Sequence, residues 1–213
     1  MTQSGLSPQR HYPQSKTNQR DRPIQMDAFE YISILTSIII GLGMAQLLLG
    51  VSRMIQHPDE TRPYWVHLSW VITMFMYSVF WWWWEFNLNE IEIWTFGAYL
   101  LVILYAFLVF LMCALLSPVN LSGYEGFEEY YYAKRAWIFG TFLIIQFVDS
   151  GVALTKGTDY FLALGVTYYV GQLLSIVLSG IAMVTRNKNF HAAFVIALLM
   201  FLTIQGFLFY GTM

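Results

Sequence analysis

The sequence predicts an all-α, polytopic membrane protein, a bundle of six transmembrane helices in one domain. Only 11% of its residues are charged and 57% are hydrophobic, whereas a soluble domain carries roughly 25% charged residues. The charges gather between long uncharged runs. Each run has close to the roughly 20 residues with which a helix crosses about 30 Å of hydrocarbon. The runs lack the alternation of a membrane β-barrel, so strands are disfavoured.

The uncharged runs give the order of the spans and the limits of the domain. We expect spans at about residues 31–51, 64–84, 93–116, 136–154, 160–185 and 190–213, within a membrane domain of residues 26–213. Residues 1–25 are rich in Gln, Ser, Pro and Arg and have little to bury, which indicates a flexible polar tail. Met26 opens a sequence typical of a natural start, so this tail is either an upstream extension or a flexible arm.

The first span carries small residues at every fourth position, and the fifth span repeats the pattern. Small residues on one helix face let two membrane helices approach closely. We therefore expect these faces at helix contacts, within the chain or between subunits. The residues are Ser33, Ser37, Gly41 and Ala45 in the first span, and Gly171, Ser175 and Ser179 in the fifth.

Aromatic residues mark both ends of the second span. Between its two aromatic ends a helix rises about 25 Å, close to the hydrocarbon thickness, so both ends are expected in interfacial belts. The alternative is an aromatic cage for a cationic ligand with Glu85 as counter-charge. Consecutive helical residues diverge around the axis, which disfavours the cage. The expected interfacial anchors are Tyr64, Trp65, Trp81, Trp82, Trp83 and Trp84, with Trp94 at the start of the third span.

Polar side chains inside the spans are the candidates for function. Four spans hold one amide each, at Gln46, Gln146, Gln172 and Gln205. These amides form either an inter-helix network or a polar solute pocket, because hydrocarbon leaves an amide unsatisfied.

Asp149 lies deep in the fourth span, on the same helix face as Gln146. We expect it to turn into the bundle, because a charge facing lipid is costly, and to be a protonated acid, to have a partner or to face a water-filled cavity. The hypothesis is that Asp149, with Glu30 at a similar depth, binds a cation or proton in an outward-facing vestibule. The alternative is that the span ends early and Asp149 belongs to an outer loop with Lys156 and Asp159.

Lys and Arg predict the orientation, because cytoplasmic loops carry an excess of both. On one side of the membrane, Lys156 would be the only Lys or Arg in the loops between spans. That side is therefore expected to be non-cytoplasmic, and both termini are expected on it. The basic tail opposes this orientation. The segment "FEEYYYAKRAW" is expected to be a short interfacial helix or a partner-docking site. The basic residues of the other side are Arg53, Arg62, Lys134, Arg135, Arg186 and Lys188.

Catalytic motifs are missing from the sequence, so an enzyme is the least favoured class. The lone Cys113 excludes an internal disulfide, and His67 and His191 are weak candidates for metal ligands. We expect no cofactor and no nucleic-acid partner. The lipid bilayer is the expected partner, with a homo-oligomer or a membrane complex as further possibilities. A small transporter or channel for an ion or polar solute is favoured over a structural or assembly subunit, because an acid is kept within a span.

The stretch "MDAFEYISILTSIIIGLGMAQLLLG" resembles the opening of uncharacterised bacterial inner-membrane proteins. The resemblance covers the first span. It implies a multi-pass protein of the bacterial inner, or plasma, membrane, and it brings no activity and no functional residue.

Overall fold

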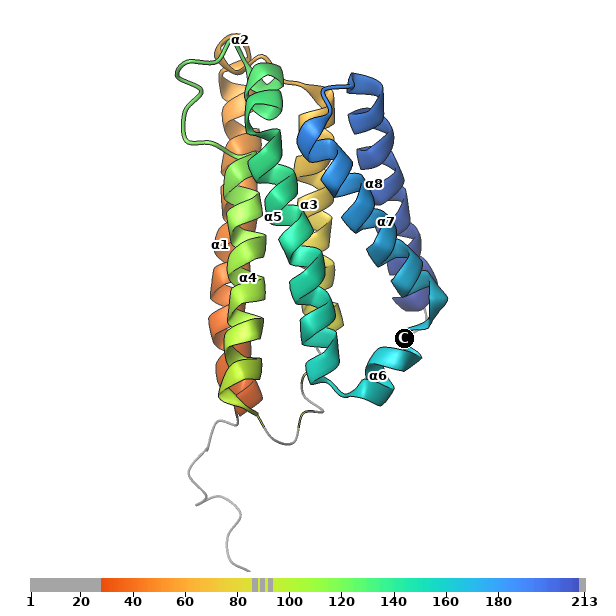
Figure 1. Ribbon diagram of the computed structural model, residues 1–213. Helices are drawn as coiled ribbons and strands as arrows, with labels where there is room; N and C mark the ends of the chain where they lie inside the picture. The colour runs from red at the N-terminus through yellow and green to blue at the C-terminus, as the bar shows by residue number, and fades with distance from the viewer. Residues whose placement is uncertain (1–27, 86–87, 89–90, 92–93, 211–213) are drawn as a thin grey trace, which may run out of the picture.

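The computed structural model describes residues 28–85, 88, 91 and 94–210, and these residues form helices without any strand (Figure 1). Long helices run side by side along the bundle. Two short helices lie at opposite ends of it, α2 (Pro58–Thr61) and α6 (Thr158–Ala163). The long helices are α1 (Ala28–Gln56), α3 (Trp65–Glu85), α4 (Phe96–Leu116), α5 (Phe127–Thr155), α7 (Gly165–Val184) and α8 (Lys188–Tyr210).

Five of the described helices, α1, α4, α5, α7 and α8, are long and apolar enough to cross a membrane. This confirms the all-helical fold and supports a membrane protein. With 21 residues α3 has the length for a span, but its hydropathy falls short of that of the apolar stretches in these five helices. Its histidine and serines lower its mean hydropathy, and so do its tyrosine and tryptophans, whose rings are amphipathic.

Two predicted spans differ most clearly from the helices in the structure. Helix α5 begins at Phe127 rather than near residue 136, so "FEEYYYAKRAW" forms its first turns and is no separate helix. With 29 residues α5 is about 43 Å long, which exceeds one hydrocarbon thickness. The span expected at 160–185 is broken between α6 and α7, where Gly165 has a φ of +80°. This left-handed conformation favours glycine, and it redirects the chain.

Helices α1 and α4 run parallel in close contact. A Cβ on Gly43 would stand 3.4 Å from Cys113 Sγ, and one on Gly50 would stand 2.5 Å from Ser117 Oγ. The contacts that move from Gly43 to Gly50 along α1 also move toward the C-terminus along α4, from Cys113 to Ser117, which fixes the parallel direction. The two glycines permit the close approach because they have no side chain. The contact face of α1 consists of Ile32, Thr36, Ile40, Gly43, Leu47, Gly50 and Met54.

The predicted small-residue faces have different surroundings. On α1, Gly41 and Ala45 are exposed, and a Cβ on Gly41 would meet nothing within 4 Å. Ser33 and Ser37 are half-buried at the edge of the contact face. On α7, Ser175 and Ser179 are buried, and Gly171 lies against the ring of Phe201 in α8.

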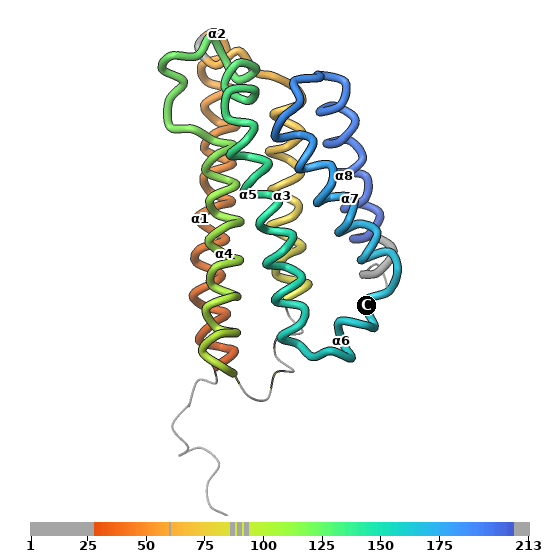
Figure 2. Tube along the Cα trace, viewed as in Figure 1, coloured from red at the N-terminus to blue at the C-terminus, as the bar shows by residue number. Residues whose placement is uncertain are grey.

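An aromatic cluster joins α3, α5 and α8 in the half of the bundle nearer to α2. Trp70 is fully buried and meets the rings of Phe139, Phe142 and Phe194 edge to face, at centroid distances of 5.2–5.5 Å. Such contacts stabilise packing beyond the area they bury. The buried rings therefore fill the space among α3, α5 and α8 in this half of the bundle. Helices α7 and α8 form the edge of the bundle farthest from α1 (Figure 2), and they contact each other only sparsely.

Candidate functional site

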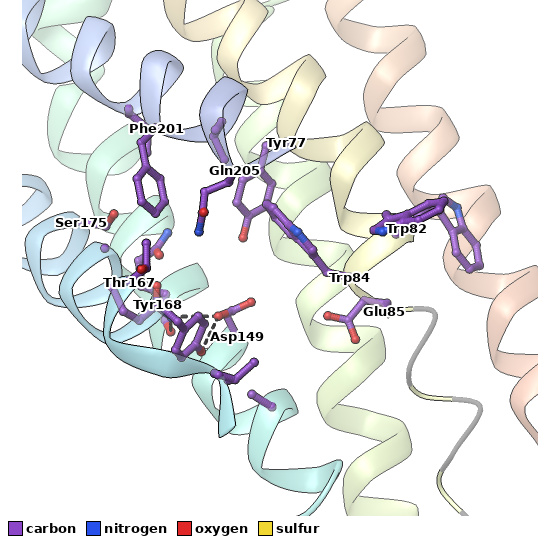
Figure 3. Close-up of a pocket in the computed structure, with 18 of the residues that line it drawn as sticks. Tyr77, Trp82, Trp84, Glu85, Asp149, Thr167, Tyr168, Ser175, Phe201 and Gln205 are labelled. Atoms are coloured by element: carbon purple, nitrogen blue, oxygen red, sulfur yellow. Dashed lines mark hydrogen bonds between the residues drawn. The ribbon is translucent and has the colours of Figure 1, made fainter. Parts of the chain in front are cut away.

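A cavity of about 990 Å³ lies among α3, α5, α7 and α8, in the half of the bundle nearer to α6. Its volume is at the upper end of the range of about 300–1,000 Å³ that is usual for small-molecule pockets. Its walls are mostly apolar and aromatic, with polar groups gathered around Asp149 (Figure 3).

Three side chains from two other helices donate hydrogen bonds to the Asp149 carboxylate. The Tyr105 hydroxyl donates to Oδ1 at 2.6 Å, and the Tyr168 hydroxyl donates to Oδ2 at 2.8 Å. The Gln172 amide also donates to Oδ2, at 2.9 Å. Donors aimed at both oxygens are the set that an ionised carboxylate accepts. Among the described residues, no Lys, Arg or His forms an ion pair with Asp149.

A chain of hydroxyl groups connects Asp149 to the α3 wall. The Tyr77 and Tyr105 hydroxyl oxygens are 2.7 Å apart. Tyr105 has one hydroxyl proton, and it donates that proton to Asp149, so Tyr77 must be the donor to Tyr105. Tyr77 also lines the cavity. Its remaining lone pair can therefore accept a hydrogen bond from a bound solute.

A buried ion pair lies at the end of the cavity nearest to α6. Lys156 Nζ lies 3.2 Å from Glu85 Oε2, and the two side chains are only 6% and 5% exposed. Lys156 also donates to the Trp84 carbonyl oxygen at 3.0 Å, and its ammonium lies 5.4 Å from the centroid of the Tyr160 ring. The charged residues that line the cavity are Glu85, Asp149 and Lys156. By formal charge, two acids and one base leave one negative charge, and Asp149 is the acid that has no base paired with it.

The structure brings together four of the six residues predicted for a solute pathway, namely Asp149, Gln146, Gln172 and Gln205. Gln172 joins Asp149 to the Gln146 carbonyl oxygen, which accepts from the same amide at 2.7 Å. Asp149 lies inside α5, which continues to Thr155, so it does not belong to a loop with Lys156 and Asp159.

The other two predicted pathway residues lie outside the cavity. Gln46 donates to the Ser117 carbonyl oxygen, next to the end of α4. Glu30 is exposed in the first turn of α1 and does not line the cavity. The shared vestibule of Glu30 and Asp149 is therefore not formed, because α1 packs mainly on α4 and has no extensive contact with α5 or α7.

The row of tryptophans diverges around α3. Trp81 is buried against Tyr105, whereas Trp83 is 40% exposed. Trp84 packs edge to face on Tyr77 and lines the cavity. The four rings do not converge on one point, and the other predicted anchors, Tyr64, Trp65 and Trp94, are half-buried or exposed.

The sequence reasoning missed the two tyrosines that bind Asp149 and the partnership of Glu85 with Lys156. Tyr105 and Tyr168 stand inside apolar runs, where a tyrosine hydroxyl needs a hydrogen-bond partner once it is buried. This requirement is the signal in the sequence that could have pointed to the two tyrosines. It does not identify the partner, because the contacts join α4, α5 and α7.

Neither predicted histidine belongs to the cavity. His67 stacks on Phe127 at 4.5 Å, and His191 is bonded to the Tyr131 hydroxyl and the Thr185 carbonyl oxygen. In the part of the chain that the structure describes, no three His, Cys, Asp or Glu residues are placed to hold a metal ion.

Comparison of the chain with models of protein families, with curated proteins and with solved structures finds no significant match. The resemblance of the first span to bacterial inner-membrane proteins stays a prediction.

Proposed function

We propose that the protein binds a cation or a small polar solute in the Asp149 cavity and moves it across the membrane, as a small transporter or channel. One observation carries this proposal. A carboxylate within a membrane-spanning helix faces a cavity of about 990 Å³ and has no cationic partner among the described residues. Charge inside a membrane is costly and is kept mainly where it meets a substrate, a proton or an ion.

The proposal includes six spans, with α3 as the sixth. Helices α1 and α4 run parallel, so a chain that crosses in α1 must cross back before it begins α4. The helix between them that has sufficient length is α3, with 21 residues. It is packed among α1, α4, α5 and α8, so its polar residues can be covered by neighbouring helices rather than by lipid.

We place the end of the bundle with α2 on the cytoplasmic side of a bacterial inner membrane. The basic residues expected there lie in or beside the α2 end, on α1, α5 and α8 and in the connections next to them, whereas Lys156 is at the other end and paired. The positive-inside rule favours this orientation, with both termini outside. The cavity then opens toward the outside, and Asp149 lies about 10 Å along α5 from Lys156.

A structural or assembly subunit is the second candidate. Gly41 and Ala45 are exposed on α1, and a Cβ on Gly41 would meet nothing within 4 Å. This face can receive a helix of a second copy or of another membrane protein. Under this alternative the protein moves no solute, and Gly41→Leu changes only its assembly state.

Flux measurements in proteoliposomes separate the two candidates. The parent protein, Asp149→Asn and Asp59→Asn are compared for uptake of Na⁺, Rb⁺, protons and radiolabelled tetraethylammonium, with thermal stability measured beside flux. Asp59 is an exposed acid in α2, so its variant controls for the change of charge alone. We expect flux of at least one probe in the parent and the Asp59 variant, and loss of that flux in a stably folded Asp149 variant. Normal flux in Asp149→Asn, or no flux of any probe in the parent, refutes the proposal and favours the structural role.

A further inference from the structure

We infer that the solute is a monocationic amphiphile, whose ammonium head binds at Asp149 and whose apolar tail lies in a groove between α7 and α8 that is open to the bilayer. The inference rests on the proposed function and names the solute class of the same site.

The charge of the cavity selects a single positive charge. Glu85 and Lys156 neutralise each other at 3.2 Å, which leaves the Asp149 carboxylate to be balanced. A monocation would complete that balance, whereas an anion would add a second negative charge beside Asp149. Inorganic ions suit hard oxygen ligands, but this site adds aromatic rings. Tyr77, Trp84 and Tyr168 line the same cavity as the carboxylate (Figure 3), and ring faces attract organic ammonium groups.

A second, apolar space provides room for a tail. A groove of about 480 Å³ runs between α7 and α8, and its polar lining is small. Val166, Val170, Leu174 and Leu178 line it from α7, and Phe194 closes one part of it from α8. The groove adjoins the Asp149 cavity, because the two share Thr167, Gly171, Ser175, Leu198 and Phe201 in their walls.

The groove faces the hydrocarbon of the bilayer. Val170 and Leu174 are 49% and 53% exposed on α7, which is apolar enough to span a membrane. Helices α7 and α8 contact each other only sparsely, so no helix ridge blocks the groove. An alkyl chain already dissolved in the bilayer can therefore slide into the groove while its charged head reaches Asp149. A fully hydrated solute would not need this side entrance.

Binding in nanodiscs of phosphatidylcholine tests the inference. Three radiolabelled probes are compared. Dodecyltrimethylammonium has both the charged head and the tail, and tetramethylammonium has the charged head alone. Dodecyl maltoside has the same tail with a neutral head. Empty nanodiscs give the background from partition into lipid. We expect the parent to bind dodecyltrimethylammonium best, and Asp149→Asn to weaken that binding at least about tenfold, as loss of a buried charge contact should.

A matched pair of variants tests the groove. Val170→Phe fills it, whereas Val177→Phe makes the same change at a position of α7 that is also 49% exposed but lies outside the groove. We expect Val170→Phe to weaken dodecyltrimethylammonium several-fold and to leave tetramethylammonium unchanged, with no effect of Val177→Phe. Equal binding of head and amphiphile, without effect of Val170→Phe, overturns the tail site but leaves the cation site. Equal binding of dodecyl maltoside overturns selection by charge. No binding of either ammonium compound overturns both the inference and the cation site.

Discussion

Replacing Lys156 by Gln removes the ammonium group that faces Glu85 at the end of α5. The Glu85 carboxylate then remains buried without its cationic partner, in a cavity that also holds Asp149. Two acids would then share a cavity without a base, and the free energy of unfolding should fall.

The size of the effect follows from burial. The two side chains are 6% and 5% exposed, so water screens the pair very little. Removing one partner of a buried ion pair typically costs about 3–5 kcal/mol. In a soluble protein of this length 1 kcal/mol corresponds to about 2–4 °C in Tm, so the expected fall is roughly 6–20 °C.

Intrinsic fluorescence in detergent micelles, at one fixed heating rate, measures Tm for the parent, each single variant and the double variant. Glu85→Gln together with Lys156→Gln places two neutral amides face to face, and it should recover at least half of the loss. Lys188→Gln is the control, because its pair with Glu128 is exposed, at 66% and 45% for the two side chains. Exposed pairs contribute little, so its Tm should not change.

Two results would refute the reasoning. One is an unchanged Tm in Lys156→Gln. The other is a double variant whose loss equals the sum of the two single losses, because independent effects would mean that the charges do not interact in the folded protein.

The remaining predictions concern packing and the hydrogen bonds of the site. Gly50→Ala should lower the free energy of unfolding by about 1–3 kcal/mol, because its Cβ meets Ser117 at 2.5 Å, whereas Gly41→Ala, with open space around it, should not lower the Tm. Trp70→Ala should cost about 3–5 kcal/mol, which thermal unfolding measures, since the ring is fully buried. Tyr105→Phe removes the donor to Asp149 Oδ1 and should weaken cation binding several-fold in nanodiscs without a comparable fall in Tm; unchanged binding would exclude a role for this hydroxyl in the site.

The sequence predicted helices well where length and lack of charge decide the outcome, because both are local properties. The predicted limits were wrong at the start of α5 and within the span expected at 160–185. The amphipathic turns that begin at Phe127 continue α5 beyond the bilayer thickness, which an apolar run cannot show. The break at Gly165 depends on a positive φ, and a glycine within an apolar run gives only a weak sign of it.

The candidate site could be predicted only in part. The cost of a charge in lipid was enough to predict that Asp149 turns inward, beside Gln146. Its partners come from α4 and α7, and which helices pack together depends on contacts across the whole chain. Glu30 was grouped with Asp149 on depth alone, and depth does not tell which side of the bundle a residue occupies.

The central claim is that a water-filled cavity, open to the non-cytoplasmic side, leads to Asp149 and binds a cation. The direct test uses a Cys113→Ser background with Gln205→Cys in the cavity wall, or Val177→Cys on the lipid face as a control. A membrane-impermeant, trimethylammonium-bearing thiosulfonate is added to one side at a time, with or without tetraethylammonium. The account predicts labelling of Gln205→Cys from the non-cytoplasmic side only, slowed by tetraethylammonium, and no labelling of Val177→Cys. Labelling from the cytoplasmic side, no labelling, or no protection by the cation would contradict it.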